Sequence, residues 1–278
     1  MIRVSDFSSL MFRDYINEDF GEQIEYMQFF APSDRICVQV YTSFDDIIAR
    51  LTNLDTNFQE VIKQDLKFES DGIYTTTFTV TGRDTGNYKF EFIQQSSGYI
   101  YKASYFQILS GDCLKDSILL RYTNYKNELA TFTMRGLQFV FDLRFKGRML
   151  YKDIEFSSDD EMFRDQDYAG HITSSFPYYS MKLTMGDENG VPVWMGQKLL
   201  YAFSCSDVKI NNKNFVKSPD SDIEKVEIKA SNPLAIYKIG IEPSSFYNYD
   251  LEPDTLGLVT NLYNPINTNT DKTIILNN

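Results

Sequence analysis

The feature that most constrains this chain is a two-residue alternation of apolar and polar side chains. Between Leu137 and Phe145 every second residue is Leu or Phe, and most of the residues between them are polar. Residues 73–81 place Phe78 and Val80 on one face and three threonines on the other. Successive side chains of a β-strand point to opposite faces, so this pattern is typical of half-buried strands. Aromatic residues make up 15% of the chain, which also favours strands.

Clusters of turn-forming residues separate the alternating stretches. Residues 81–87 and 186–190 are rich in Gly, Asn and Asp, which adopt the positive φ values of tight hairpins. Further strand candidates are residues 23–30, 36–42, 88–92, 99–109, 117–123, 148–156, 182–185, 208–210, 224–229 and 236–241. Many short strands between turns predict a mainly all-β fold with antiparallel β-sandwich-like domains and few short helices.

Two short segments are helix candidates. Residues 43–51 have a capping-box pattern, Ser43 with Asp46, before apolar residues at helical spacing. The same residues could equally form one arm of a hairpin that turns at residues 55–57, because a short apolar run does not decide between helix and strand. Pro192 precedes the second candidate, residues 193–200, and proline is favoured at the start of a helix.

A loop-like stretch at residues 110–116 predicts a domain boundary between two β-rich halves. We expect an N-terminal segment (residues 1–19) and a first β-sandwich domain (residues 20–112). A second β-sandwich domain (residues 113–245) and an extended C-terminal arm (residues 246–278) follow. The chain has no strict internal repeat.

The C-terminal arm has a composition unlike the rest of the chain. Ten of the nineteen residues from Thr260 to Asn278 are Asn or Thr, so the segment has little to contribute to a core. We expect a neighbouring subunit to hold it, since a polar segment needs a few apolar side chains to fix it in a groove. The candidate anchors are Leu262, Tyr263, Ile274, Ile275 and Leu276.

Net charge and cysteine content limit the partners and the compartment. The net charge of −12 disfavours nucleic acid and anionic membrane surfaces as partners. Cys37, Cys113 and Cys205 are too widely spaced for a Cys-x-x-Cys pair and favour three unpaired thiols in a reducing compartment. The N-terminus lacks the pattern of a secretory signal, and no segment approaches the roughly 20 apolar residues of a membrane span. We therefore expect synthesis and assembly in a cytoplasm.

Few residues suggest chemistry. A single histidine excludes enzymes that need two or more imidazoles, and His171 is expected in a loop at the surface or at an interface. Asp153 and Glu155 could face one groove from a strand, as glycoside hydrolysis requires, but a polar outer face is favoured. The acidic residues 157–167 lack the spacing of a calcium loop and favour a solvated loop. The prediction is therefore no catalytic residue, no cofactor and no metal.

Aromatic residues outside the alternating stretches are the remaining candidates for binding. Tyr178 and Tyr179 follow Phe176 and Pro177, and a second group lies at residues 247–249. Tyrosine combines a rigid apolar ring with a hydrogen-bonding tip, so such residues can stack on sugars or anchor a protein interface. Most of the other aromatic residues are expected in the core.

Three segments together suggest a family. They are residues 117–124, residues 182–194 and residues 200–216, of which the last ends in a hairpin-like pattern. Their order resembles uncharacterised tail-region structural proteins of phages and prophages of gut Bacteroidetes, including the crAss-like group, over roughly residues 20–242. The resemblance implies a β-sandwich building block of a virion tail, ring or hub, and it implies no catalytic residue.

Two functions follow as hypotheses. The first is a non-enzymatic virion structural protein that assembles through β edges and its C-terminal arm. Its partners would be copies of itself, in a ring-forming homo-oligomer, and other virion proteins. The alternative is a carbohydrate-binding or glycan-cleaving β-sandwich that uses exposed tyrosines.

Overall fold

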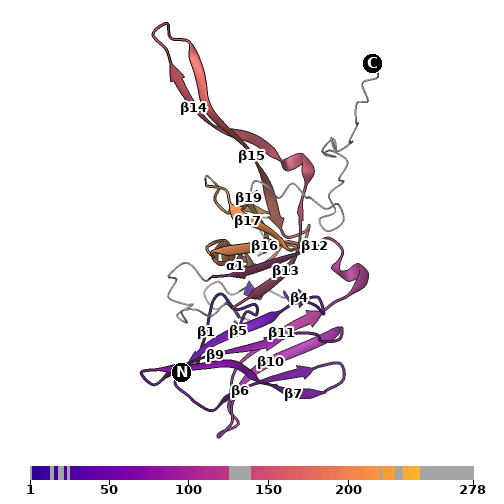
Figure 1. The fold of residues 1–278 in the computed structure, drawn as a ribbon. Helices are drawn as coiled ribbons and strands as arrows, with labels where there is room; N and C mark the ends of the chain where they lie inside the picture. Colours follow the sequence, from indigo (N-terminus) through magenta and orange to yellow (C-terminus); the bar gives the residue numbers. More distant parts are fainter. Residues whose placement is uncertain are drawn as a thin grey trace, which may run out of the picture.

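The computed structural model describes residues 2–12, 16–17, 22–23, 26–124, 139–219, 221–228 and 234–244. The predicted all-β class is confirmed, because strands dominate and the described residues contain one α-helix. Two β-rich units lie one above the other, and a long hairpin projects from the upper unit (Figure 1). The five predicted arm anchors, Leu262, Tyr263, Ile274, Ile275 and Leu276, lie outside the described residues.

The lower unit is a sandwich of two sheets. Its strands are β1 (Ile2–Val4), β4 (Gln28–Phe30), β5 (Ile36–Thr42), β6 (Ile47–Asn53), β7 (Gln59–Ile62), β8 (Gln64–Ser70), β9 (Ile73–Val80), β10 (Gly86–Gln94) and β11 (Ile100–Ile108). One sheet has the order β1-β5-β9-β8 and the other the order β4-β11-β10-β6-β7. All pairs are antiparallel except β4 with β11. The facing apolar residues form one core, in which the rings of Phe78 and Phe92 join the two sheets at a centroid distance of 5.6 Å.

The upper unit closes on itself. Its elements are β12 (Ser117–Thr123), β13 (Phe141–Met149), β14 (Glu155–Arg164), β15 (Gly170–Met185), α1 (Val193–Phe203), β16 (Asp207–Ile210), β17 (Lys213–Lys217), β18 (Glu224–Glu227) and β19 (Ala235–Pro243). Strands β12, β13, β15, β19, β17 and β16 pair in that order, and β16 pairs with β12 again. The six strands therefore form a closed antiparallel barrel, which leaves none of them as an open edge around the ring.

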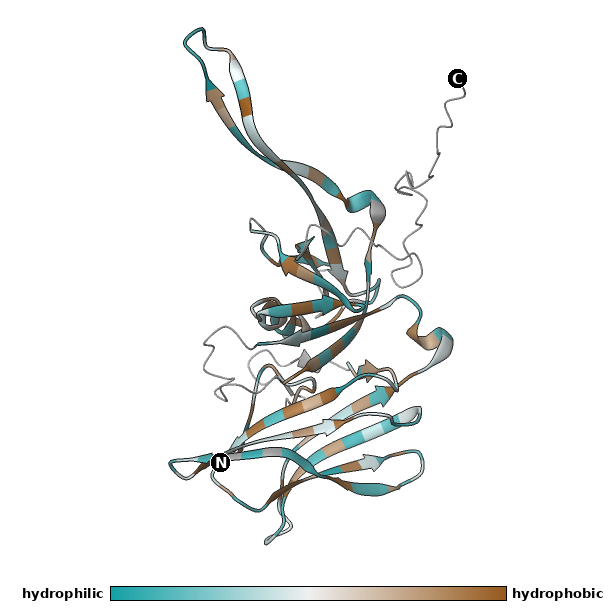
Figure 2. Cartoon of the chain, viewed as in Figure 1, coloured by the Kyte–Doolittle hydropathy of each residue, from teal (hydrophilic) through white to brown (hydrophobic). Residues whose placement is uncertain are grey.

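The barrel has its own core, to which α1 and the sandwich both contribute. Met195, Leu199 and Ala202 of α1 are buried in it, and so are Phe7 and Cys37 from the sandwich side. Short elements complete the described chain: β2 (Ile16–Asn17) pairs with β3 (Glu22–Gln23), η1 (Gly111–Leu114) links the two units, and η3 (Tyr151–Asp153) precedes β14. Figure 2 shows the resulting alternation of hydrophobic and hydrophilic residues along the strands.

Residues 5–10, which we call the N-terminal strap, lie between the two units. The strap is hydrogen-bonded to β5, with Ser5 N donating to Gln39 O at 2.9 Å and Ser9 N to Cys37 O at 2.8 Å. From the barrel, Tyr122 donates its hydroxyl to Phe7 O at 2.7 Å. The buried Lys198 ammonium of α1 donates to the carbonyls of Asp6 and Ser8. The strap therefore connects the outer face of the sandwich with the barrel core.

A polar junction beside the strap holds the units together. Arg121 donates to Asp142 Oδ1 at 2.7 Å and to Oδ2 at 2.8 Å, and the backbone N–H of Arg35 donates to the same Oδ2 at 2.7 Å. Arg144 donates from Nε and Nη2 to the two oxygens of Asp34, at 2.6 and 2.8 Å. Both carboxylate side chains are fully buried. Such paired forks are strong and geometrically specific, so the junction fixes how sandwich and barrel meet.

Several element predictions are now decided. Residues 36–42 and 117–123 are strands with the predicted bounds. Of residues 43–51, for which helix and strand were equally favoured, residues 47–51 lie in β6, which turns into β7. The predicted strand 148–156 is wrong, because β13 ends at Met149 and η3 follows. The helix after Pro192 is confirmed and continues to Phe203.

No helix within the described ranges is long and apolar enough to cross a membrane.

Candidate functional site

The most prominent surface feature is the hairpin of residues 155–180, which we call the projecting hairpin. It consists of β14 and the first eleven residues of β15, and it stands away from the barrel (Figure 1). A ten-residue strand spans about 30 Å, so the tip is far from either core. Among the described strands, β14 pairs with β15 alone, and β15 meets β19 and β13 only from Met181 onward. Within the described part of the chain, both outer edges of the hairpin are therefore unpaired.

The register assigns the side chains of the hairpin to two faces. Directly paired residues point to the same side, so Phe156 shares a face with Tyr179, and Met162 shares that face with Ile172. The register shifts after Glu161, so Met162 pairs with Ile172 rather than with Thr173, and the pairing then continues to the tip. We call this face, which consists of Phe156, Ser158, Asp160, Met162, Arg164, Gly170, Ile172, Ser175, Pro177 and Tyr179, the apolar face. The opposite face, which we call the acidic face, consists of Glu155, Ser157, Asp159, Glu161, Phe163, His171, Ser174, Phe176, Tyr178 and Ser180.

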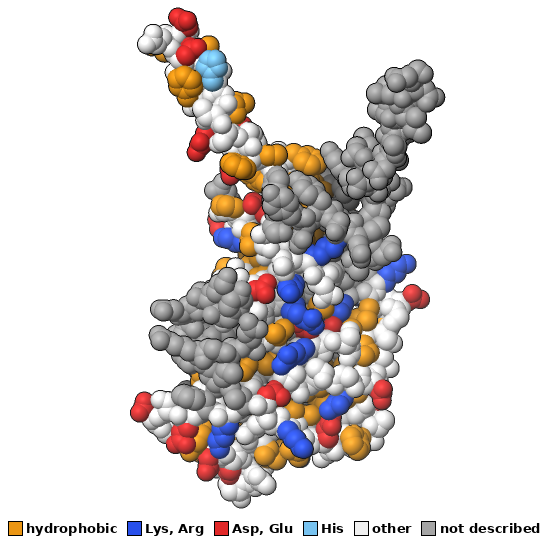
Figure 3. Space-filling model, in the orientation of Figure 1, with side chains coloured by type: hydrophobic (Ala, Val, Ile, Leu, Met, Phe, Trp, Pro, Cys, Tyr) orange, Lys and Arg blue, Asp and Glu red, His pale blue; other side chains and the backbone are white. Residues whose placement is uncertain are grey.

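Large apolar side chains on both faces are open to solvent. Phe156 is 84% exposed and Phe176 66% exposed, and Met162, Phe163 and Ile172 are each more than half exposed. In the space-filling view, hydrophobic and acidic side chains share the hairpin out to its tip (Figure 3). An isolated two-stranded hairpin is marginally stable in water, and a cluster of exposed apolar residues marks an interaction site. The projecting hairpin is therefore the candidate functional site.

The tip is a tight turn that presents one tyrosine. Asp165 N donates to Ala169 O at 3.0 Å, and Tyr168 between them has a φ of +61° and an 81% exposed side chain. A bulky residue in the left-handed region is unusual, and such backbone strain is concentrated at functional sites. The rings of Phe163 and His171 stack just below the turn, with centroids 5.6 Å apart.

Hydrogen bonds within the hairpin use two of its carboxylates. His171 Nε2 lies 2.9 Å from Asp165 Oδ2, and this contact, followed by the Ala169 N–H, lowers the pKa of Asp165. Hydrogen bonds from Ser175 and then from Ser158 lower the pKa of Asp160. Both carboxylates therefore favour the ionised form, and the hairpin stays strongly acidic at neutral pH. It carries six acidic residues and one arginine.

The structure places the predicted site residues as follows. Tyr178 and Tyr179 lie on β15 near the base of the hairpin, and both are half-buried. Tyr179 packs against the barrel core, so it is not the exposed ring that the sequence suggested. The more exposed rings of the hairpin belong to Phe156, Tyr168 and Phe176. The sequence analysis grouped Phe176 with the two tyrosines but did not single out Phe156 or Tyr168.

Three further predictions about this region are corrected. Residues 157–164 are strand residues of β14, not a loop, because β15 provides the pairing that local composition does not indicate. His171 is in β15 rather than in a loop. Asp153 belongs to η3 and Glu155 begins β14, so the two carboxylates do not alternate on one strand. Within the described part of the chain, no three metal-ligating side chains come together.

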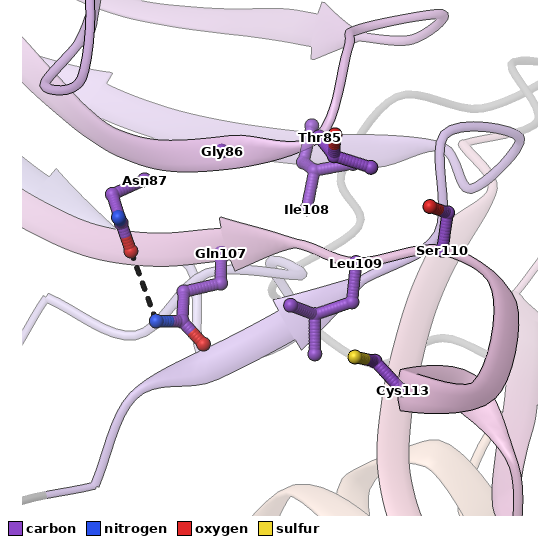
Figure 4. A pocket seen from close by; sticks show the side chains of 8 residues that line it. All are labelled: Thr85, Gly86, Asn87, Gln107, Ile108, Leu109, Ser110 and Cys113. Atoms are coloured by element: carbon purple, nitrogen blue, oxygen red, sulfur yellow. Dashed lines mark hydrogen bonds between the residues drawn. The ribbon is translucent and has the colours of Figure 1, made fainter.

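A shallow pocket of about 370 Å³ lies at the end of the sandwich near η1 (Figure 4). It is formed by the start of β10, the end of β11 and the turn that carries Cys113. Gln107 donates to Asn87 Oδ1 at 2.9 Å along its wall. The lining residues are Thr85, Gly86, Asn87, Gln107, Ile108, Leu109, Ser110 and Cys113, which include no acid, base or cation.

The three thiols should react very differently. Burial raises the pKa of Cys37 to about 12, and burial likewise raises the pKa of Cys205 to about 12. Cys113 is exposed. Because the thiolate is the reactive form, we expect iodoacetamide at pH 8 to modify Cys113 in the native protein and the other two only after denaturation. Peptide mass spectrometry measures this, and rapid native labelling of Cys37 would contradict the packing of the strap against β5.

Comparisons of the chain with protein-family models, with curated proteins and with solved structures found no match.

Proposed function

We propose that this chain is a non-enzymatic structural protein of a virion, in the tail, ring or hub region of a phage of Bacteroidetes. The observation that carries the proposal is the projecting hairpin, which exposes five large apolar side chains on two strands without a core of their own. Buried in a neighbouring subunit, these side chains would be removed from water and the free strand edges covered. The resemblance of residues 20–242 to tail-region proteins of such phages supplies the biological setting.

The partners in this proposal are copies of the chain and other virion structural proteins. The strongly acidic composition supports it, because an acidic subunit does not adhere to packaged DNA. The C-terminal arm is proposed as a second contact, with Leu262, Tyr263, Ile274, Ile275 and Leu276 as its anchors. The protein would occupy the host cytoplasm during assembly and the virion afterwards.

The glycan-binding alternative is less well supported by the site. Tyr178 and Tyr179 are half-buried at the base of the hairpin, and the second aromatic group, at residues 247–249, lies outside the described residues. On the two faces of the hairpin the most exposed rings are Phe156 and Phe176, which lack the hydroxyl with which tyrosine can bond sugar hydroxyls, and Tyr168 is a single exposed tyrosine at the tip. Exposed phenylalanine is better suited to a protein partner.

Replacing Phe156 and Phe176 together with serine tests the proposal. Both rings are mostly in solvent, so the double variant should fold and should melt within about 3 °C of the wild-type protein. We expect it to be absent from particles formed in a complemented infection, as judged by mass spectrometry of purified virions. Truncation after residue 259 tests the arm in the same assay.

Phe58 provides a matched control. Its side chain is 66% exposed, as is that of Phe176, but it lies just before β7 of the sandwich. Phe58→Ser should therefore enter particles at the wild-type level. Equal incorporation of the hairpin variant and the control would refute the proposed role of the hairpin.

A further inference from the structure

We propose that the acidic face of the projecting hairpin binds a second copy of this chain, at a cationic patch where the sandwich meets the barrel. This inference rests on the proposed function and names the partner of the hairpin. We call the patch the junction patch and define it as Arg35, Arg121, Arg144 and Lys209.

The hairpin offers charge and aromatic rings on one face. Asp159 and Glu161 are on the acidic face of β14, with Phe163 and Phe176 beside them in the register. Asp160, which is bonded to Ser158 and Ser175, is on the other face. The acidic face therefore presents carboxylates next to aromatic rings, a combination that suits guanidinium and ammonium groups.

Like charge makes pairing between two hairpins unfavourable. Residues 159–161 are three consecutive acids on the free edge of β14. Charged edge strands prevent edge-to-edge association, and two hairpins side by side would bring twelve carboxylates together. The hairpin therefore requires a different, positively charged surface on its partner.

The barrel of the same chain provides such a surface. Outside the hairpin, the described residues from 113 to 244 include 13 Lys and Arg against 10 Asp and Glu, although the whole chain is acidic. In Figure 3, Lys and Arg side chains gather across the middle of the molecule at the level of β12 and β13. Charge is therefore divided within one chain, with an acidic projection and a basic band.

Within this band, the junction patch has an excess of cations. Lys209 lies opposite Arg121 in the β12–β16 register, and Arg121 lies opposite Asp142 in the β12–β13 register. Asp142 pairs with Arg121 and Asp34 pairs with Arg144, whereas Arg35 and Lys209 have no ion-pair partner among the described residues.

Arg35 also has a hydrogen-bond donor that lacks an acceptor among the described residues. Its Nε is buried and has no hydrogen-bond acceptor among the described residues, while the residue as a whole remains partly accessible. Arg121 keeps 32% of its side chain exposed. A carboxylate of a second copy would contact the accessible parts of Arg35 and Arg121, where charge-assisted hydrogen bonds are strong.

A contact between hairpin and patch joins two different surfaces. In the ring proposed above, each copy gives its hairpin to one neighbour and receives the hairpin of the other, so association continues beyond a dimer. Such head-to-tail contacts produce a ring when the rotation closes and a filament when it does not. The inference therefore predicts assemblies larger than dimers.

Charge reversal tests this contact in the full-length protein. We expect wild-type protein at low ionic strength to form species larger than a dimer in analytical ultracentrifugation. Asp159→Lys with Glu161→Lys should weaken association by at least about 100-fold, because like charges then meet at the interface. Lys209→Glu should also weaken it, and mixing the two variants should restore assembly of each with the other.

Two further variants serve as a net-charge control and as a second test of the junction patch. Asp45→Lys with Asp84→Lys changes the net charge equally on the sandwich and should assemble as the wild-type protein does. Arg35→Gln removes a cation of the patch without adding an acid and should also weaken assembly. It provides a second test of the patch in case Lys209→Glu fails to fold. A monomeric or symmetric dimeric wild-type protein, or assembly that is insensitive to both hairpin and patch variants, would overturn the inference. Exclusion of the hairpin charge variant from virions without any loss of self-association would overturn it too, because the hairpin would then bind another virion protein, while leaving the proposed function intact.

Discussion

Replacing Asp142 with alanine is expected to lower the free energy of unfolding by about 3–5 kcal/mol. The carboxylate is fully buried and accepts two hydrogen bonds from Arg121 and one from the backbone of Arg35. Its removal leaves the partly exposed Arg121 guanidinium and the backbone N–H of Arg35 without their acceptor, and breaking a hydrogen-bonded pair at a buried carboxylate is strongly destabilising. For a chain of this size the melting temperature should fall by about 10 °C.

Differential scanning calorimetry measures this effect and also shows where it acts. Because Asp142 joins β13 to the sandwich, we expect the sandwich and barrel to melt together in the wild-type protein and separately in the variant. Glu227→Ala is the control, since its ion pair with Lys225 is exposed and 3.8 Å long, and such pairs contribute little. A shift for Asp142→Ala no larger than that of the control would show that the junction does not couple the units.

Replacing Lys198 with alanine is expected to destabilise the protein by about 3 kcal/mol. The side chain is only 2% exposed, and its ammonium donates to the carbonyls of Asp6 and Ser8 in the N-terminal strap. Alanine leaves a cavity in place of the side-chain stem and leaves both carbonyls without this donor. The strap should then detach more easily from the barrel.

Comparison with Lys198→Met separates packing from hydrogen bonding. Methionine fills most of the space but cannot donate, so we expect a smaller loss of about 1–2 kcal/mol. Limited proteolysis should cut the strap faster in both variants than in wild-type protein. Urea denaturation gives the free energies, and Lys225→Met on the exposed β18 is the control. Unchanged strap cleavage in Lys198→Ala would contradict the proposed anchoring.

The parts of the fold that the sequence predicted are those where one face of a strand is buried. Residues 36–42 and 117–123 alternate because a core lies on one side of each, and the structure gives both strands the predicted bounds. Residues 43–51 were ambiguous because a short apolar run fits both periods, and pairing with β10 and β7 decides for a strand. The periodicity of a strand also does not show which strand it pairs with, so the β15–β19 pairing that closes the barrel could not be predicted from the sequence.

The candidate site was largely hidden for a related physical reason. Side chains of β14 are exposed on both faces, so no core imposes an alternation, and residues 157–164 resemble an acidic loop. The junction was equally hidden, because Arg144 and Asp34 are 110 positions apart. The run of aromatics at residues 176–179 was a usable signal for the hairpin, although the most exposed of these rings is Phe176 rather than either tyrosine.

Hydrogen–deuterium exchange of the wild-type protein tests the central claim most directly, since it reports whether the projecting hairpin is covered in the assembly. The backbone N–H groups of β14 should exchange rapidly in dilute, dissociated protein, because the hairpin is a two-stranded element in solvent. In assembled protein the same groups should be protected at least about tenfold, whereas exchange in the core strands β5 and β12 should be unchanged. Equally rapid exchange of β14 in both states would show that the hairpin takes no part in assembly.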